Sequence, residues 1–104
     1  MVVAADAIAA YVARGRAAFD ADPALRDAIL YQIVVLGEAA KATLAADPSL
    51  ESLFPGVEWR AMARMRDRVT HRYWATDPEV VWSTASRSVP ELRQELLGAL
   101  ERLT

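Results

Sequence analysis

The sequence contains no cysteine and no long apolar run, and each absence narrows what the protein can be. Without cysteine there is no disulfide framework and no thiolate metal site, which suits a reducing compartment. No apolar stretch reaches the length of about eighteen residues that a membrane span needs, and the first residues lack a basic segment followed by an apolar one. We therefore expect a cytoplasmic protein without a membrane partner.

The chain is also short of large apolar side chains for its length. Its 104 residues are 54% apolar, but 21 of them are alanine, which buries little area per side chain. The length suffices for one domain, over residues 1–104, with a single core. A thin core would leave an apolar face exposed on a helical monomer, and pairing with a second copy is the usual way to cover it. The composition thus favours a homodimer.

The residue pattern predicts an all-α fold, a compact bundle of about five helices. Five prolines interrupt a helix-prone chain, and no alternating strand pattern or Asn-Gly hairpin signal lies between them. The helices are expected over residues 3–19 and 23–46, from residue 58, from residue 77 and over residues 88–103. Residues 47–57 are expected to form a loop.

Several details of this pattern can be checked against a structure. Asp22 is expected to cap the second helix, with Pro23 in its first turn. That helix is apolar all round in its middle, which indicates burial from several sides. Gly37 lies inside it, where glycine costs about 1 kcal/mol relative to alanine, so a close helix approach is expected there. The last helix is predicted to bury one stripe of leucines: Leu92, Leu96, Leu100 and Leu103.

The net charge of −2 argues by itself against a nucleic-acid partner, but the charge is unevenly distributed. Residues 59–74 hold five arginines and one acid, a local charge of +4, so the rest of the chain carries −6. Phosphate contacts are local, and clustering on one element therefore counts for more than the total charge. A solvated arginine-rich helix face is the alternative interpretation, and a charge run alone would favour it.

His71, the only histidine, lies within this basic segment. With no second histidine and no cysteine, a metal site is not expected. Neighbouring arginines supply donors for a phosphate. An imidazole beside an arginine suits phosphodiester cleavage, in which histidine moves a proton and arginine stabilises developing negative charge. A histidine with a purely structural role is the alternative.

Cleavage of RNA through its 2′-hydroxyl works best with two groups that transfer protons, and this chain has one histidine. A two-fold dimer would place a second His71 and a second Arg66 opposite the first pair. On an ideal helix Arg66 and His71 lie about 140° apart. Either the helix loosens before His71, or the two side chains face different sides of a shared groove.

The segment RDRVTHRY, residues 66–73, resembles the R-x4-H-x-Y motif of HepT-type toxins in the HEPN superfamily. Those proteins are small, all-helical, dimeric and metal-independent ribonucleases. LGEAAK (36–41) resembles the Ile-Gly-Glu-Ala segment of the family. FPGVEW (54–59) resembles its Pro-x-x-x-Trp lead-in, and ATDPEVVW (75–82) the stretch after the tyrosine. The resemblance extends over residues 7–103.

The resemblance implies roles for individual residues. Arg66 and His71 match the catalytic pair. Tyr73 matches the tyrosine to which a partner antitoxin, a minimal nucleotidyltransferase of the MntA type, adds AMP to silence the toxin. Asp67 stands where the family most often has asparagine; it could orient Arg66 or His71, and it would also repel phosphate. Arg72 stands where a small or acidic residue is common, and could compensate for Asp67.

Further residues can support this site. Arg64, Arg68 and Arg72 are the candidates for binding RNA phosphates. Glu38 lies in an apolar helix, where a buried carboxylate needs a cationic partner; Arg66 is the candidate, and a solvated Glu38 is the alternative. The tryptophans are expected to belong to the core rather than to stack on bases: Trp59, Trp74 and Trp82.

The sequence thus predicts a metal-independent endoribonuclease, the toxin of a toxin–antitoxin pair, which needs no cofactor. It would cleave RNA at a dimer-interface cleft and be silenced by AMP addition to Tyr73. It would act as a homodimer, or within a larger hetero-oligomer with the nucleotidyltransferase. The alternative is a non-catalytic HEPN-like interaction module that binds a nucleotidyltransferase or nucleic acid without cutting.

Overall fold

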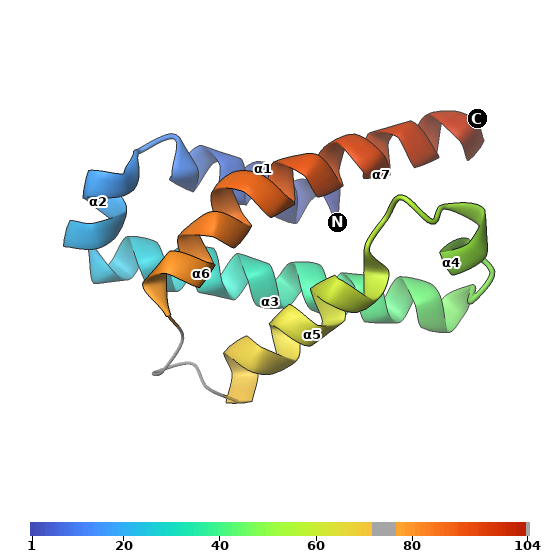
Figure 1. Cartoon of the computed structure of the whole chain (residues 1–104), viewed down its shortest axis with the longest axis horizontal. Helices are drawn as coiled ribbons and strands as arrows, with labels where there is room; N and C mark the ends of the chain where they lie inside the picture. The colour runs from blue at the N-terminus through green and yellow to red at the C-terminus, as the bar shows by residue number, and fades with distance from the viewer. Residues whose placement is uncertain (72–76, 104) are drawn as a thin grey trace.

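The computed structural model describes residues 1–71 and 77–103, and within these ranges all regular secondary structure is helical, as predicted. The elements follow one another as α1 (Val2–Val12), α2 (Arg16–Ala21), α3 (Pro23–Ala46), α4 (Leu50–Leu53), α5 (Trp59–His71), α6 (Pro78–Ser83), η2 (Thr84–Ser88) and α7 (Val89–Leu103). The central helix α3 runs the length of the molecule, with α1 and α7 on one side and α5 on the other (Figure 1).

The predicted bounds of α3 are confirmed, and so is its cap. The side chain of Asp22 accepts a hydrogen bond from the backbone N–H of Ala24 at 3.0 Å, and Pro23 takes the first turn. The buried face of α3 supplies much of the core: Leu25, Ile29, Leu30, Ile33, Leu36 and Ala40. Among the described helices, α3 alone is long and apolar enough to cross a membrane, a test that core helices of soluble proteins also pass.

The close approach expected at Gly37 is confirmed, and the helix that approaches is α5. A Cβ atom added at Gly37 would lie 2.2 Å from the Cβ of Arg66 and 2.9 Å from the carbonyl oxygen of Met62. Glycine therefore allows α3 and α5 to pack with their backbones nearly in contact. This crossing fixes the position of Arg66 relative to α3.

The prediction of one helix over residues 3–19 is wrong, because the chain turns at Gly15. Its φ of +91° lies in a region that L side chains rarely adopt, so the first helix ends at Val12 and a second begins at Arg16. The turn lays α2 on α3 and buries Phe19. The predicted loop over 47–57 likewise contains a short helical turn, α4.

The chain after residue 77 was predicted to form two helices, and this boundary is wrong. Asp77 caps α6, and its side chain accepts a hydrogen bond from the backbone N–H of Glu79 at 2.9 Å. However, α6 continues into α7 through the π-helical turn η2, in which Val89 N–H donates to the carbonyl of Thr84. Pro90 has no N–H, and its ring would clash with the carbonyl four residues back. The wider turn just before it lets the helix continue.

The leucine stripe of α7 is only half buried. Leu92 and Leu96 lie in the core, but Leu100 is 52% exposed and Leu103 is 62% exposed, so the prediction is wrong for these two. The reason is length, because the C-terminal end of α7 projects past the start of α1 (Figure 1).

An ion pair ties α2 to α6. The Arg16 guanidinium pairs with Glu79, and it donates to Asp20 at 2.9 Å. It also lies against the rings of Phe19 and Trp82, which pack with their centroids 5.1 Å apart. The expected core role of Trp59, which is buried, is confirmed, and Trp82 is partly buried and packs against the core. Trp74 lies outside the described residues.

Candidate functional site

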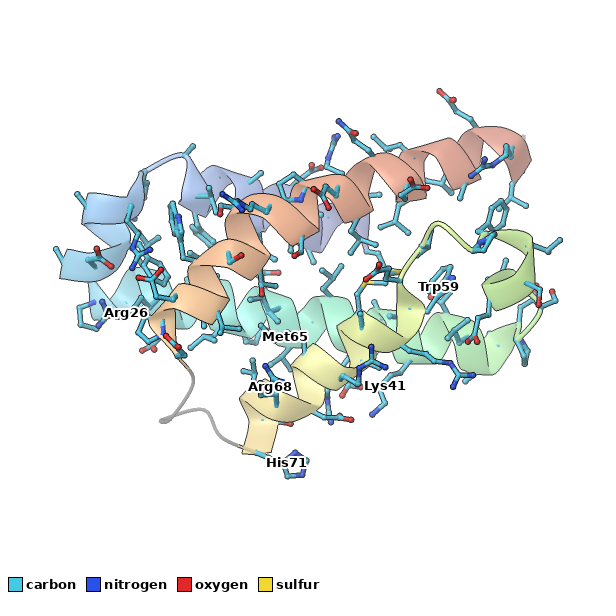
Figure 2. The ribbon with its side chains drawn as sticks, in the orientation of Figure 1. Arg26, Lys41, Trp59, Met65, Arg68 and His71 are labelled. Atoms are coloured by element: carbon cyan, nitrogen blue, oxygen red, sulfur yellow. The ribbon has the colours of Figure 1, made fainter. Side chains whose placement is uncertain are left out.

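The candidate site is built on α5, where it crosses α3. The helix α5 is regular from Trp59 to His71, so the alternative of a helix that loosens before His71 is excluded over the described residues. Arg66 faces α3 and is 27% exposed, whereas His71 is exposed at the C-terminal end of α5 (Figure 2). Arg66 and His71 of one chain therefore point to different sides, about 140° apart around the helix.

Arg66 is held by two carboxylates. Its Nη2 pairs with the carboxylate of Glu38, and its Nη1 donates to Oδ1 of Asp67 at 3.0 Å. The predicted Glu38–Arg66 pair is confirmed, although the Glu38 side chain is also 51% exposed and so keeps part of its hydration. The hydrogen bond to Asp67, followed by the charge of Glu38, raises the pKa of Arg66 above its ordinary value. The guanidinium is therefore fixed in place and permanently charged.

Lys41 completes this cluster, although no motif in the sequence marked it as a site residue. Its Nζ lies 3.3 Å from Oδ1 of Asp67, the same oxygen that accepts from Arg66. The hydrogen bonds from Arg66 and then Lys41 lower the pKa of Asp67. The spacing of Glu38 and Lys41, three residues apart on one helix, was the signal that could have placed both against α5. We call Glu38, Lys41, Arg66 and Asp67 the charge cluster.

His71 has a defined tautomer. Its Nδ1 lies 2.7 Å from the backbone carbonyl oxygen of Asp67. A carbonyl oxygen can only accept, so Nδ1 carries a proton, and in the neutral imidazole Nε2 then holds the free lone pair. Because the side chain is exposed, this lone pair is accessible to a substrate hydroxyl. The imidazole is thus oriented as a base.

The other predicted basic residues divide into two groups. Arg64 and Arg68 are exposed on α5, and within residues 1–71 and 77–103 neither pairs with a carboxylate. Both are therefore free to meet phosphates. Arg72 and Tyr73 lie outside the described residues. In the part of the chain that the structure describes, no group of three His, Cys, Asp or Glu side chains could hold a metal ion.

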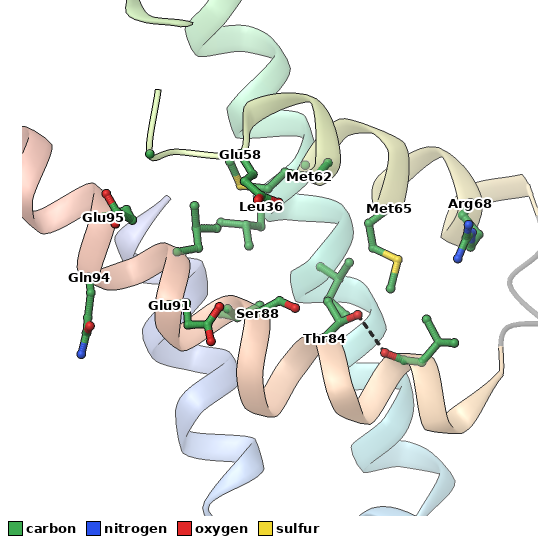
Figure 3. A pocket seen from close by; sticks show the side chains of 17 residues that line it. Leu36, Glu58, Met62, Met65, Arg68, Thr84, Ser88, Glu91, Gln94 and Glu95 are labelled. Carbon is green, nitrogen blue, oxygen red and sulfur yellow. Dashed lines mark hydrogen bonds between the residues drawn. The ribbon is translucent and has the colours of Figure 1, made fainter. Parts of the chain in front are cut away.

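A groove of about 560 Å³ lies between α5 and the helix formed by α6, η2 and α7 (Figure 3). Its floor includes Leu36, Met62 and Met65. Glu58, Glu91 and Glu95 line one end and Arg68 the other, so the groove is apolar with a mostly acidic rim. This surface does not suit RNA, and the candidate RNA-binding side chains are instead those at the His71 end of α5.

Comparison with known proteins gives a consistent set of relatives. The family model described as Ribonuclease HepT-like matches residues 1–97. A protein of Thermococcus cleftensis named Probable ribonuclease HepT is 34% identical over 85 residues, which cover 82% of this chain and 71% of that protein. A protein of Caldanaerobacter subterraneus subsp. tengcongensis, named as a candidate RNase, is 29% identical over 84 residues, or 81% of this chain and 72% of its own length.

A third relative, from Methanocaldococcus jannaschii, is named as a gamma-glutamylcyclotransferase and candidate RNase. It is 28% identical over 79 residues, which cover 76% of this chain but only 34% of that longer protein. No solved structure matches the chain significantly.

Proposed function

Because the chain belongs to the Ribonuclease HepT-like family, we propose that it is a metal-independent endoribonuclease that uses Arg66 and His71. One observation carries the assignment of these residues. Arg66 is fixed against α3 by two carboxylates, while His71 presents a free Nε2 at the exposed end of the same helix. An immobilised cation and an accessible imidazole base are two of the groups that RNA cleavage through the 2′-hydroxyl uses, and a proton donor for the leaving oxygen is the third.

The reaction follows from these groups. Nε2 of His71 takes the proton of a 2′-hydroxyl, and the resulting oxygen attacks the adjacent phosphorus. Arg66 stabilises the negative charge that develops on the phosphoryl oxygens. The bond from phosphorus to the 5′-oxygen breaks, and this oxygen receives a proton from a second, protonated imidazole. The products are a 2′,3′-cyclic phosphate and a 5′-hydroxyl.

The second imidazole, which donates the proton to the 5′-oxygen, must come from a second copy of the chain. Each chain has one histidine, and its Arg66 and His71 point to different sides of α5. A two-fold axis beside the end of α5 would gather two arginines and two histidines in one cleft. The exposed Leu100 and Leu103 are consistent with a chain that buries further surface on assembly. The proposed unit is therefore a homodimer.

The biological role proposed is that of a toxin in the cytoplasm, controlled by a nucleotidyltransferase antitoxin of the MntA type. The support is the resemblance of residues 66–73 to the R-x4-H-x-Y motif. Tyr73 follows His71 by two residues, so AMP on its phenol would add bulk and negative charge beside the exposed arginines of α5. Such a phosphate would compete with RNA for those arginines.

A second candidate function is favoured by the same charge cluster. Both terminal nitrogens of Arg66 already have carboxylate partners, whereas a catalytic arginine needs donors for phosphate. If the two carboxylates leave no N–H of Arg66 available to an RNA phosphate, the chain would be a non-catalytic module that binds its nucleotidyltransferase or nucleic acid.

Purified protein and labelled RNA in the presence of EDTA separate the two functions. The proposed enzyme cuts RNA in EDTA and leaves 2′,3′-cyclic phosphate ends, and Arg66→Ala and His71→Ala each abolish cutting while the helical circular dichroism spectrum is retained. Cutting that requires a divalent metal, or that survives His71→Ala, contradicts the mechanism. Absence of cutting by the wild-type chain, with retained RNA binding, supports the interaction module.

A further inference from the structure

Lys41 lies outside the R-x4-H-x-Y motif and yet touches it. It is on α3, one helical turn after Glu38, and its Nζ shares Oδ1 of Asp67 with Nη1 of Arg66. The side chains of Lys41 and Asp67 are about half exposed, at 46% and 47%. Figure 2 places Lys41 beside α5, on the helix that Arg66 packs against.

The charges in the cluster explain what such a contact does. Without Lys41, Arg66 would be the one cation beside two carboxylates, Glu38 and Asp67, and these three groups together carry a net charge of −1. Lys41 brings the cluster to zero. In the absence of Lys41, the negative charge of Asp67 would interact with Arg66 alone. It would attract the guanidinium more strongly and would repel an approaching phosphate.

We propose that Lys41 is a positioning residue of the ribonuclease: by sharing the Asp67 carboxylate, it leaves Arg66 able to engage the RNA phosphate. The inference rests on the proposed function of Arg66. It also accounts for the aspartate at position 67, which stands where the family that the motif resembles most often has asparagine. Lys41 acts through Asp67 and Arg66 rather than by touching the reacting atoms.

A simple structural staple between α3 and α5 is the competing explanation, and the geometry argues against it. A half-exposed ion pair contributes little to stability. The packing of Gly37 against Arg66 and Met62 already joins the two helices. A staple would act through stability, so it predicts that Lys41→Met lowers the free energy of unfolding, measured in urea, and leaves the kcat of the folded chain unchanged. The positioning role predicts the reverse.

The test is a double-mutant cycle of Lys41→Met and Asp67→Asn, read as kcat and KM on labelled RNA. With Asp67 present, Lys41→Met should lower kcat/KM about tenfold, the size expected for strongly coupled neighbours. In the Asp67→Asn background the same change should cost less than about twofold. Lys41→Arg should retain activity because it keeps the charge. Arg93→Met is the matched control, since it removes a cation from an exposed pair with Asp6 and should leave kcat/KM unchanged.

A second readout does not depend on activity. In a carboxyl-carbon NMR titration, Lys41→Met should raise the pKa of Asp67, whereas Arg93→Met should leave it in place. A wild-type chain that cuts RNA, with an equal loss on Lys41→Met in both backgrounds or no loss in either, overturns the role of Lys41 alone. A wild-type chain that does not cut overturns the proposed function and this inference with it.

Discussion

At the scale of single residues, Arg66 and His71 lie on one helix but in different environments. The guanidinium is bound by Glu38 and Asp67 on the inner side of α5, and the imidazole is exposed at its end with Nδ1 tied to a backbone carbonyl. An arginine fixed in this way needs no reordering when charge develops on a phosphate. Among residues 1–71 and 77–103, no protein group has to be displaced for Nε2 of a neutral His71 to reach a hydroxyl.

Tyr73 is the residue through which control is expected. Incubation with the nucleotidyltransferase partner and ATP should add one or more AMP units to the phenol and block cleavage, because the new phosphate would occupy the arginines that RNA requires. Tyr73→Phe should resist the modification, keep much of the activity and remain toxic beside the partner. Intact-mass spectrometry decides the matter: no mass gain on the wild-type chain, or an equal gain on Tyr73→Phe, contradicts this control.

Acid should weaken the fold through two of its carboxylates. Arg66 and then Lys41 lower the pKa of Asp67, and Arg16 lowers that of Glu79. A pKa that is lower in the folded chain gives stability that is present above the unfolded value of about 4 and is lost as the pH falls through the folded value. The free energy of unfolding, measured with denaturant, should therefore fall less between about pH 6 and about pH 3 for the double variant Asp67→Asn/Glu79→Gln than for the wild-type chain. An equal loss contradicts the assignment.

The crossing of α3 and α5 is what matters at the scale of elements. Gly37→Ala would place a methyl group 2.2 Å from the Cβ of Arg66 and 2.9 Å from the Met62 carbonyl, where backbone cannot move aside easily. We expect a destabilisation of about 1–3 kcal/mol, as for overpacked sites, together with loss of RNA cleavage because Arg66 is displaced.

Gly98→Ala is the matched control for this prediction. Gly98 is also inside a helix, but a Cβ there meets nothing closer than 3.9 Å. Alanine should stabilise α7 by about 0.5–1 kcal/mol and leave cleavage unchanged. Urea unfolding of both variants makes the comparison, and a Gly37→Ala chain as stable as the wild type would contradict the role given to the crossing.

The same elements show what a sequence can predict and where it fails. The cap at Asp22, the close approach at Gly37 and the Glu38–Arg66 pair follow from local chemistry and helical spacing, and all three were predictable. The turn at Gly15 and the π-helical turn before Pro90 were not predictable. A helix can either end or continue with altered geometry at a glycine or a proline, and tertiary packing determines which of the two occurs. The spacing of Lys41 from Glu38 placed it on the face of α3 that meets α5, but which side chain of α5 lies opposite it depends on the relative rotation of the two helices, which spacing alone does not give.

At the scale of the whole molecule, the two candidate catalytic side chains of one chain, Arg66 and His71, point to different sides of α5. The family match over residues 1–97 assigns it to the HepT-like ribonucleases, and the proposed cleft joins two copies. Sedimentation of the wild-type chain at micromolar concentration should accordingly give a species of twice 11.4 kDa. A purely monomeric species would remove the second imidazole from the mechanism.

Mixed dimers test the shared cleft most directly. Wild-type and His71→Ala chains carrying different affinity tags can be co-expressed, and the dimer holding one copy of each can be isolated by sequential purification. If one cleft uses both histidines, as a base and as an acid, this dimer should cleave labelled RNA at least tenfold more slowly than the wild-type dimer, in line with the usual contribution of a proton-transfer group. A wild-type dimer formed from the same two tags serves as the control. Retention of half the wild-type activity would mean that each chain cuts on its own, and it would contradict the account.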